Sequence, residues 1–314
     1  MDRVRTPDER FAALPDFPWS PRYLEVPAGD GSAPLRVAYI DEGPRAAPVV
    51  LMLHGEPSWS FLYRHVIRAV VDAGLRVVAP DLVGFGRSDK PTDRAVYTYA
   101  AHAAWLRAFL DAADLRAITL VCQDWGGLLG QRLVGAQPDR FARVVAANTF
   151  LPTGDTKMSS AFFAWRQFSQ TVPVFPAGRI VAGAVIRGLA PDVLAAYDAP
   201  FADEDAKAGA RAFPMLVPVN PDDPACAANR LAWDGLARFT RPFLTVFGDS
   251  DPITRGADAI MQARIPGAAG QPHAVLTRAG HFLQEDVGPE LAAAIIALVA
   301  ATPEAAADPT GPAC

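Results

Sequence analysis

The sequence predicts an α/β protein with a mainly parallel sheet and one helical insertion, and three observations lead to this fold class. Short apolar segments alternate with segments of helical length through the first half of the chain. This alternation is typical of a parallel sheet that is covered by helices on both faces. The alternation stops between residues 152 and 229 and then resumes. With 314 residues, of which 51% are hydrophobic, the chain is also long and apolar enough to bury a large core.

The predicted strands are short apolar runs. Residues 35–40 alternate in polarity, which indicates a half-exposed strand. Four later runs are apolar throughout and predict fully buried strands, at residues 49–53, 77–79, 118–122 and 144–147. After the insertion, further strands are predicted at residues 243–247 and 274–276.

The predicted helices occupy the intervals between these strands, at residues 61–73, 97–113, 126–136, 257–263 and 289–301. Residues 152–229 instead contain aromatic and alanine-rich helical pieces broken by prolines. We therefore predict a core formed by residues 1–151 and 230–314, with residues 152–229 as a helical cap over the carboxyl edge of the sheet. Two consecutive domains divided near Pro152 are the competing interpretation. The tail at residues 302–314 is rich in Ala, Pro and Gly and is predicted to be frayed.

The charge and hydropathy of the chain argue against several classes of partner. The net charge of −5 comes without a basic face, so we expect neither nucleic acid nor an anionic membrane as a main partner. No apolar run approaches the roughly 20 residues that span a bilayer. The N-terminal segment is charged and lacks the apolar stretch of a secretory signal. These features predict a cytoplasmic protein.

The cysteines and histidines form neither a disulfide pattern nor a metal-binding pattern. Cys122, Cys226 and Cys314 are few, odd in number and widely spaced, so we expect reduced thiols. The histidines lack metal-ligand spacing, and we expect no metal centre; they are His54, His65, His102, His273 and His281.

Reactive residue types follow four of the predicted strands. Open α/β sheets carry their functional groups at the carboxyl ends of strands. His54 lies in the segment HGEP, Asp124 in CQDWG, Asp251 in GDSDP and His281 in AGHF. The order nucleophile, acid, histidine is that of the α/β-hydrolase fold, and CQDWG fits the small-x-nucleophile-x-small pattern of its nucleophile elbow. The sequence thus predicts this fold, with an eight-stranded sheet, and a catalytic set of Asp124, Asp251 and His281.

Each of these residues also has a structural interpretation. Asp124 and Asp251 both precede predicted helices, where aspartate is a common N-cap. Asp249 competes with Asp251 as the catalytic acid, although the Gly-x-x-Asp spacing of the fold favours Asp251. His281 by itself is compatible with a hydrogen-bonded core histidine. His54 is interpreted as a structural residue that holds the loop beneath the site.

A carboxylate nucleophile restricts the chemistry. A carboxylate attacks a carbonyl poorly, because it is the better leaving group of the adduct. It displaces a leaving group from an sp³ carbon effectively and forms an alkyl ester. His281, oriented by Asp251, is then the base that activates water to hydrolyse the ester. The backbone N–H groups of Glu56 and Trp125 are predicted to form the oxyanion hole, and no organic cofactor is required.

Two substrate classes fit this chemistry, strained epoxides and alkyl halides. An epoxide needs a proton donor on its oxygen, usually supplied by tyrosines of the cap, and the predicted cap contains one tyrosine, Tyr197. A departing halide needs N–H donors instead, and Trp125 lies next to the nucleophile. Trp165, in the early cap segment FFAW, is the candidate for the second donor. These residues favour the halide.

Five segments resemble the haloalkane dehalogenase family, and the similarity extends over nearly the whole chain. They are HGEPSWSFLYRH, PDLVGFGRSDKP, QDWGG, YDAPF and AGHFLQED. One branch of the family has an asparagine in the position of Glu56 and a glutamate acid after the sixth strand, where this chain has Asn148-Thr149-Phe150. The chain resembles instead the branch with an aspartate acid after the seventh strand and two halide-binding tryptophans.

That resemblance implies specific roles and partners. Asp124, Asp251 and His281 would form the triad, and Trp125 and Trp165 would bind the halide. The implied reaction converts a 1-haloalkane and water to a primary alcohol, a halide ion and a proton, in a monomer or weak homo-oligomer with a detoxification role. An epoxide hydrolase and a catalytically silent binding protein of the same fold remain the alternatives.

The second halide donor also has a structural interpretation. Trp165 lies within an apolar stripe formed by Phe162, Phe163 and Phe168, so a packing contact between cap and core is a real alternative. Trp59 opens the helix after the segment HGEP. The other three tryptophans are interpreted as packing residues: Trp19, Trp105 and Trp233.

Overall fold

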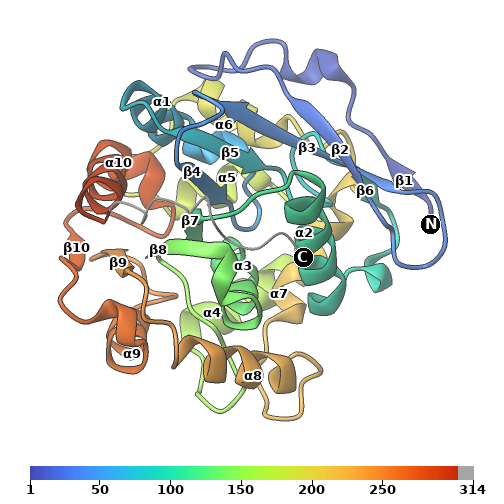
Figure 1. Ribbon diagram of the computed structural model, residues 1–314. Helices are drawn as coiled ribbons and strands as arrows, with labels where there is room; N and C mark the ends of the chain where they lie inside the picture. Colours follow the sequence, from blue (N-terminus) through green and yellow to red (C-terminus); the bar gives the residue numbers. More distant parts are fainter. Residues whose placement is uncertain (303–314) are drawn as a thin grey trace.

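The chain forms one eight-stranded sheet, described here from a computed structural model that covers residues 1–302 (Figure 1). The strand order is β10-β9-β8-β7-β4-β5-β3-β2. Neighbours from β10 to β5 are parallel, whereas β3 is antiparallel to both β5 and β2. The predicted mainly parallel sheet is therefore confirmed. Its strands are β2 (Arg22–Val26), β3 (Leu35–Glu42), β4 (Val49–Leu53), β5 (Arg76–Pro80), β7 (Ile118–Gln123), β8 (Phe141–Ala147), β9 (Phe243–Gly248) and β10 (Ala274–Leu276).

Two hydrophobic cores lie on opposite faces of the sheet. Successive side chains of a strand point to opposite faces, so Leu51 and Leu53 of β4 enter one core and Val50 and Met52 enter the other. Because both faces are covered, β4 is apolar at every position. The first core is covered by α2 (Tyr99–Ala112), α3 (Trp125–Ala136) and α8 (Cys226–Leu236), and the second by α1 (Arg64–Asp72) and α10 (Leu283–Ala301).

Several elements differ from the sequence prediction at their ends. A 3₁₀ turn at Ser60–Tyr63 precedes α1, so the helix predicted from residue 61 begins later. The last helix, α10, begins at Leu283 rather than at Pro289. It consists of two helical pieces that meet at a kink at Val287. The edge strand β2 was missed, since its apolar residues do not alternate with polar ones and most of its side chains are exposed. A further short pair, β1 (Arg3–Val4) and β6 (Lys90–Pro91), also lacked a signal.

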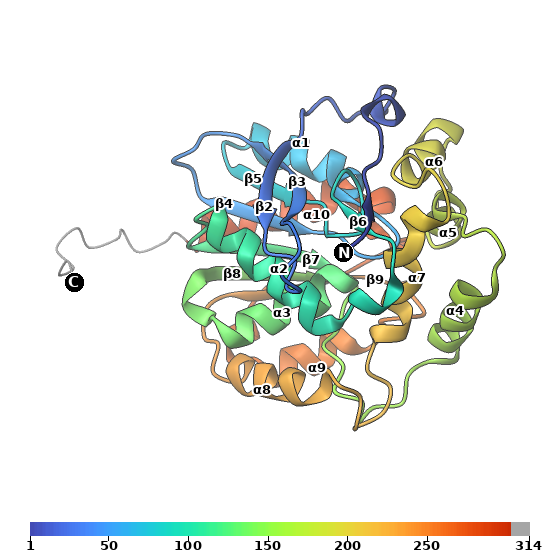
Figure 2. The same cartoon turned by 90° about the vertical axis from the view of Figure 1, so that its right-hand side faces the viewer.

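Only helices occur between β8 and β9 in the part of the chain that the structure describes. Four of them, α4 (Ser160–Thr171), α5 (Ala177–Gly183), α6 (Pro191–Asp198) and α7 (Ala208–Leu216), lie together on one side of the molecule (Figure 2). Residue 229, the predicted end of the cap, falls inside α8, which packs on α3 of the core. The contact is so close that a Cβ on Gly235 would lie 2.0 Å from the carbonyl oxygen of Gly135. The helices that lie over the site thus end before α8.

Strands from both ends of the chain share one sheet, which bears on the domain organisation. β9 and β10 follow the cap in sequence, yet β9 pairs with β8, which precedes the cap. The alternative of two consecutive domains divided near Pro152 is therefore wrong. The predicted tail lies outside the described residues except for Thr302, as does Cys314, whereas Cys122 and Cys226 are buried free thiols. No helix within residues 1–302 combines the length and the apolar character required to cross a membrane.

Candidate active site

Asp124 occupies a sharp turn between β7 and α3. Its backbone adopts φ 48° and ψ −125°, a conformation that is strained for a residue with a Cβ. The turn fits only because its neighbours are small: a Cβ on Gly126 would lie 2.1 Å from the carbonyl oxygen of Leu53, and one on Gly127 would lie 2.0 Å from Thr149 Oγ1. The Asp124 side chain makes no capping hydrogen bond to α3. The carboxylate therefore projects away from the helix and is not an N-cap.

His281 lies between two aspartates. Its Nδ1 is 3.0 Å from Asp251 Oδ2, and its Nε2 is 3.5 Å from Asp124 Oδ2. Asp251 is 1% exposed, and its carboxylate also accepts hydrogen bonds from the Ile253 N–H and the Thr254 hydroxyl. Asp249, the competing acid of the sequence analysis, is exposed and bonded to its neighbour Ser250. The structure thus brings Asp124, Asp251 and His281 together and leaves Asp249 outside.

The two carboxylates control the protonation of His281. Burial by itself lowers the pKa of this imidazole, but the charge of Asp251 and the hydrogen bonds and charge of Asp124 outweigh burial and raise the pKa to about 10. In turn, burial works against ionisation of Asp251, yet the charge and hydrogen bond of His281 hold its pKa below the ordinary value. The resting site therefore favours an imidazolium between two carboxylates.

Gln123 contacts the same ring nitrogen of His281 as Asp124 does. Its Nε2 lies 3.2 Å from His281 Nε2 and 3.2 Å from the His281 carbonyl oxygen. The carbonyl oxygen can only accept, so the amide group that faces it is the NH₂ donor. If His281 carries no proton on Nε2, this nitrogen has a free lone pair, which can accept a hydrogen bond from the Gln123 NH₂ group. Gln123 therefore suits the neutral imidazole with its proton on Nδ1, toward Asp251.

Asn148 connects the three loops that carry these residues. Its Nδ2 donates to the carbonyl oxygens of Gly280 and His281 at 2.7 and 3.0 Å, and its Oδ1 accepts the Gly248 N–H at 2.8 Å. Its backbone carbonyl accepts the N–H of Asp124 at 3.1 Å. Asn148 thus fixes the nucleophile turn, the start of the acid loop and the histidine loop relative to one another.

Glu56 contributes both its backbone and its side chain to the site. Its N–H donates to Asp124 Oδ1 at 2.8 Å. The N–H of Trp125 lies at the first position of α3, where it has no intrahelical partner. The Glu56 side chain is 5% exposed, and its Oε1 has no hydrogen-bond partner among the described residues. Burial and the nearby charge of Asp124 raise the pKa of this carboxyl well above its ordinary value, which favours its neutral form.

His54 holds the loop below the nucleophile, as the sequence analysis proposed. Its Nε2 accepts the N–H of Leu82 at 2.9 Å, and its Nδ1 lies 2.9 Å from the carbonyl oxygen of Gly55. Burial lowers the pKa of this imidazole despite the nearby charges of Asp81 and Asp124. A neutral, fully bonded His54 has a structural role.

A cavity of about 770 Å³ lies between the cap and the carboxyl edge of the sheet. Asp124, Glu56 and His281 line its base, and most of the remaining walls are apolar. No tyrosine from residues 1–302 lines the cavity. Tyr197, the tyrosine of the predicted cap, is buried elsewhere, and its hydroxyl bonds to Glu285. The described side chains contain no cluster of three or more His, Cys, Asp or Glu residues that could hold a metal ion.

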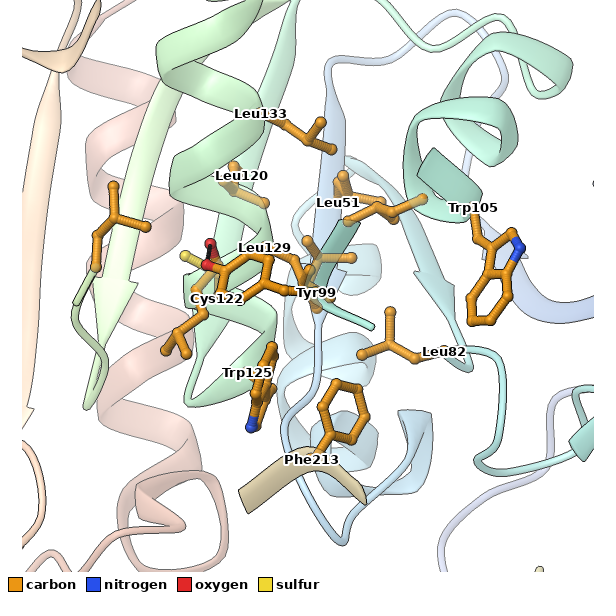
Figure 3. Packing of buried hydrophobic residues seen from close by; sticks show 14 of the residues in the cluster. Leu51, Leu82, Tyr99, Trp105, Leu120, Cys122, Trp125, Leu129, Leu133 and Phe213 are labelled. Carbon is orange, nitrogen blue, oxygen red and sulfur yellow. Dashed lines mark hydrogen bonds between the residues drawn. The ribbon is translucent and has the colours of Figure 1, made fainter. Parts of the chain in front are cut away.

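The six tryptophans fall into two groups. Three indole N–H groups donate to backbone carbonyls in the packed interior, those of Trp59, Trp105 and Trp233. Trp125 and Trp165 line the cavity, and the structure gives neither indole a hydrogen-bond partner within residues 1–302. Trp125 packs between Tyr99 and Phe213 and directs its nitrogen away from Leu129 and Leu133 (Figure 3). The sixth, Trp19, packs on Phe17 near the surface.

Sequence reasoning missed the roles of several polar residues. Gln123 was noticed only as part of a motif, although a glutamine that ends a buried strand directly before a nucleophile is a signal in itself. Asn148 was used only to compare branches of the resembled family. The side chain of Glu56 was not considered, because the oxyanion hole requires only its backbone N–H.

A nucleophile turn, an acid loop and a histidine loop beneath a helical cap define an α/β hydrolase. In agreement, the family model described as alpha/beta hydrolase fold matches residues 48–185. The chain is 54% identical to a haloalkane dehalogenase of Psychrobacter cryohalolentis, over 95% of this chain and 98% of the relative. It is 53% identical to one of Mycobacterium marinum, over 94% of this chain and 99% of the relative.

A solved structure gives the same assignment. The tetrameric haloalkane dehalogenase of Paraglaciecola agarilytica is 38% identical and superimposes with a TM-score of 0.85, over 93% of this chain and 97% of the other. The chain therefore belongs to the haloalkane dehalogenase family and is a hydrolase that acts on carbon–halogen bonds.

The raised pKa of His281 predicts a pH dependence of stability. The imidazole titrates near 6.5 in the unfolded chain and at about 10 in the folded protein. The folded state therefore holds an extra proton between these values, and the stability that this proton contributes is complete below about pH 6.5 and is lost as the pH rises toward 10. Relative to His281→Gln, the wild-type free energy of unfolding should fall with pH by up to about 1.4 kcal/mol per pH unit in this range. Denaturant titrations at several pH values measure the difference, and parallel pH curves for the two proteins would contradict it.

Proposed function

We propose that this protein hydrolyses 1-haloalkanes to a primary alcohol, a halide ion and a proton through an alkyl ester of Asp124. The observation that carries the proposal is the position of this carboxylate at the base of a largely apolar cavity between the cap and the sheet. One of its oxygens is held by the Glu56 N–H, and the other faces His281. In this proposal Asp124 is the nucleophile, His281 the general base and Asp251 the acid that orients His281. The substrates are a haloalkane and water, and no cofactor or metal takes part.

The first half-reaction is a displacement at carbon. Oδ2 of Asp124 forms a bond to the carbon, and the carbon–halogen bond breaks with its electron pair leaving on the halide. Oδ1 becomes the carbonyl oxygen of the ester. This oxygen already accepts the Glu56 N–H at 2.8 Å. Together with the N–H of Trp125, that donor would stabilise the negative charge which Oδ1 gains when water attacks the ester.

The second half-reaction depends on a change in the pKa of His281. Alkylation removes the charge of Asp124, which is one of the causes that raise this pKa. The imidazolium then releases its proton to solvent, and the neutral ring faces Gln123 and the attacking water. His281 takes a proton from water as the water oxygen bonds to the carbonyl carbon of the Asp124 ester. His281 then passes this proton to the departing alcohol. The new carboxylic acid returns its proton to His281, which restores the resting charges.

An epoxide substrate is less compatible with these surroundings. Ring opening by Asp124 places negative charge on the epoxide oxygen, which requires a proton donor in the cavity. Tyr197 does not line the cavity and is bonded to Glu285. The unbonded indole N–H groups of Trp125 and Trp165 suit a halide better.

We expect the purified protein to release bromide and acid from 1-bromobutane and to leave styrene oxide unchanged. The physical reason is that the cavity offers indole donors to a departing anion but no tyrosine hydroxyl to an alkoxide. Bromide analysis and diol analysis of parallel incubations measure the two activities. Diol formation without bromide release would favour an epoxide hydrolase, and neither product would favour a catalytically silent binding protein.

Replacing His281 by alanine should separate the two half-reactions. Asp124 needs no base for the displacement, so the variant should still release one equivalent of bromide per protein. Hydrolysis needs the imidazole, so the alkyl ester should accumulate. Intact-protein mass spectrometry and peptide mapping should find the alkyl group on Asp124. A correctly folded variant that forms no adduct would contradict the proposed division of roles.

Trp125 and Trp165 are the proposed halide donors. Trp125 directly follows the proposed nucleophile Asp124 in the sequence and is 3% exposed. Its indole N–H is therefore held close to the carbon that would react. Trp165 lies on α4 of the cap, where its ring contacts Phe168 and Phe175. Trp125 is buried and Trp165 is half-buried, and neither indole N–H has a hydrogen-bond partner in the described chain. A halide between the floor and the cap would supply it.

The variant Trp165→Phe tests the second donor. Phenylalanine keeps most of the apolar contact, so the fold should be spared. Loss of one donor to a developing anion should slow bromide release by on the order of 10²-fold and weaken inhibition by added bromide. Trp19→Phe is the matched control, because Trp19 does not line the cavity and should leave both measurements unchanged. Wild-type rates and bromide inhibition in Trp165→Phe would assign the second donor to another residue.

A further inference from the structure

The end of cap helix α5 is joined to the turn that carries His281. The N–H of His281 donates to the carbonyl oxygen of Ala184 at 2.8 Å. Beside this bond, a Cβ on Gly280 would lie 2.4 Å from the same carbonyl oxygen and 3.2 Å from Val185 Cα. The two backbones therefore approach so closely that only glycine fits at position 280.

The Asp286 carboxylate bridges the same two segments. Oδ2 accepts the N–H of Gly280 at 2.8 Å, on the histidine turn. Oδ1 accepts the N–H groups of Ile186 and Arg187 at 2.9 Å each, on the cap. Asp286 is 1% exposed, and no cationic side chain within residues 1–302 forms a salt bridge with it. Its buried charge is thus stabilised by three backbone donors, which would lose their partner if the carboxylate were removed.

The segments that Asp286 joins form one wall of the cavity. Ala184, Val185 and Ile186 contribute to this wall from the cap, and Gly280 and His281 contribute from the core. A displacement of the end of α5 would therefore pull on the backbone of His281. The imidazole tolerates little movement, because its Nδ1 must remain at Asp251 and its Nε2 at the ester of Asp124.

We propose that Asp286 is a positioning residue that couples the cap to His281, so that the imidazole is correctly placed for hydrolysis only when the end of α5 is seated. The inference rests on the proposed role of His281 as the base. Its functional consequence is that the hydrolytic half-reaction proceeds only in the closed cavity, whereas displacement by Asp124 does not depend on this contact.

Other contacts between cap and core lack this connection. Tyr197 of α6 bonds to Glu285, which pairs with Arg64 of the core, and none of these three side chains bonds to the histidine turn. Asp198 accepts the N–H of Gly178 at 2.9 Å near the first turn of α5, at the opposite end of that helix. Asp198 thus provides a carboxylate that supports the same helix without touching His281.

The variant Asp286→Asn tests the coupling. Asparagine has the same shape, but it carries no charge and presents an NH₂ group to backbone donors. We expect hydrolysis of the alkyl-enzyme to slow by on the order of 10²-fold, as a small misplacement of a catalytic group does. The first-turnover release of bromide from 1-bromobutane should change by less than about threefold, so that the adduct accumulates. Rapid-quench bromide analysis and intact-protein mass spectrometry measure the two steps.

The matched control is Asp198→Asn, which should show the wild-type ratio of the two steps. Equal losses in both steps of Asp286→Asn, or the same ratio as in Asp198→Asn, would overturn the inference. A His281→Ala sample in the same experiment tests the proposed function separately: absence of its adduct refutes the role of His281 rather than the role of Asp286.

Hydrogen–deuterium exchange on the wild-type protein keeps the inference testable if Asp286→Asn does not fold. Peptides that contain residues 184–187 and 279–282 should open with the same protection, because they share Asp286 and the bond between His281 and Ala184. Free exchange of the cap peptide while the histidine peptide stays protected would overturn the coupling.

Discussion

Hydrogen bonds from Asn148 hold the nucleophile turn, the acid loop and the histidine loop at one edge of the sheet. These loops follow three different strands, and Asn148 bonds to all three of them. The strained backbone of Asp124 is tolerated because its N–H and carbonyl oxygen are both bonded, to Asn148 and Thr149. The geometry of the site is therefore imposed by the scaffold before any substrate binds, which is the condition for electrostatic stabilisation of a developing charge.

The buried strands and the turn that carries Asp124 were predictable because each has a local signal in the sequence. Strands such as β4 are apolar at every position, and the turn at Asp124 requires small neighbours that are visible in CQDWG. The long-range partners left no such signal. Whether Asp249 or Asp251 meets His281 depends on how the loop after β9 folds back, and Asp286 acts on cap residues distant in sequence. The predicted cap boundary at residue 229 falls inside α8, because α8 has the same alanine-rich character as the cap helices although it packs on α3.

In the proposed reaction, the charges in the site pass through two successive states. In the resting enzyme the imidazolium of His281 lies between two carboxylates, and Gln123 presents a donor to the same ring. The donor of Gln123 opposes the charged ring and suits the neutral one. In the proposed reaction, alkylation removes the charge of Asp124 that favours the imidazolium, so the Gln123 donor then favours the neutral ring of His281. The neutral carboxyl of Glu56 beside Asp124 fits this scheme, because a further negative charge there would oppose the attack of water on the ester.

The apolar walls of the cavity also affect what leaves it. A haloalkane gives up little hydration when it moves from water into such a cavity, whereas a halide ion and an alcohol are strongly hydrated outside it. The apolar walls thus favour binding of the substrate and also favour release of the hydrated products into water. Two neutral indole groups would stabilise a halide as it forms without adding a positive charge of their own. A cationic side chain beside Trp125 would accelerate bond cleavage but retain the ion, and product release would then limit turnover.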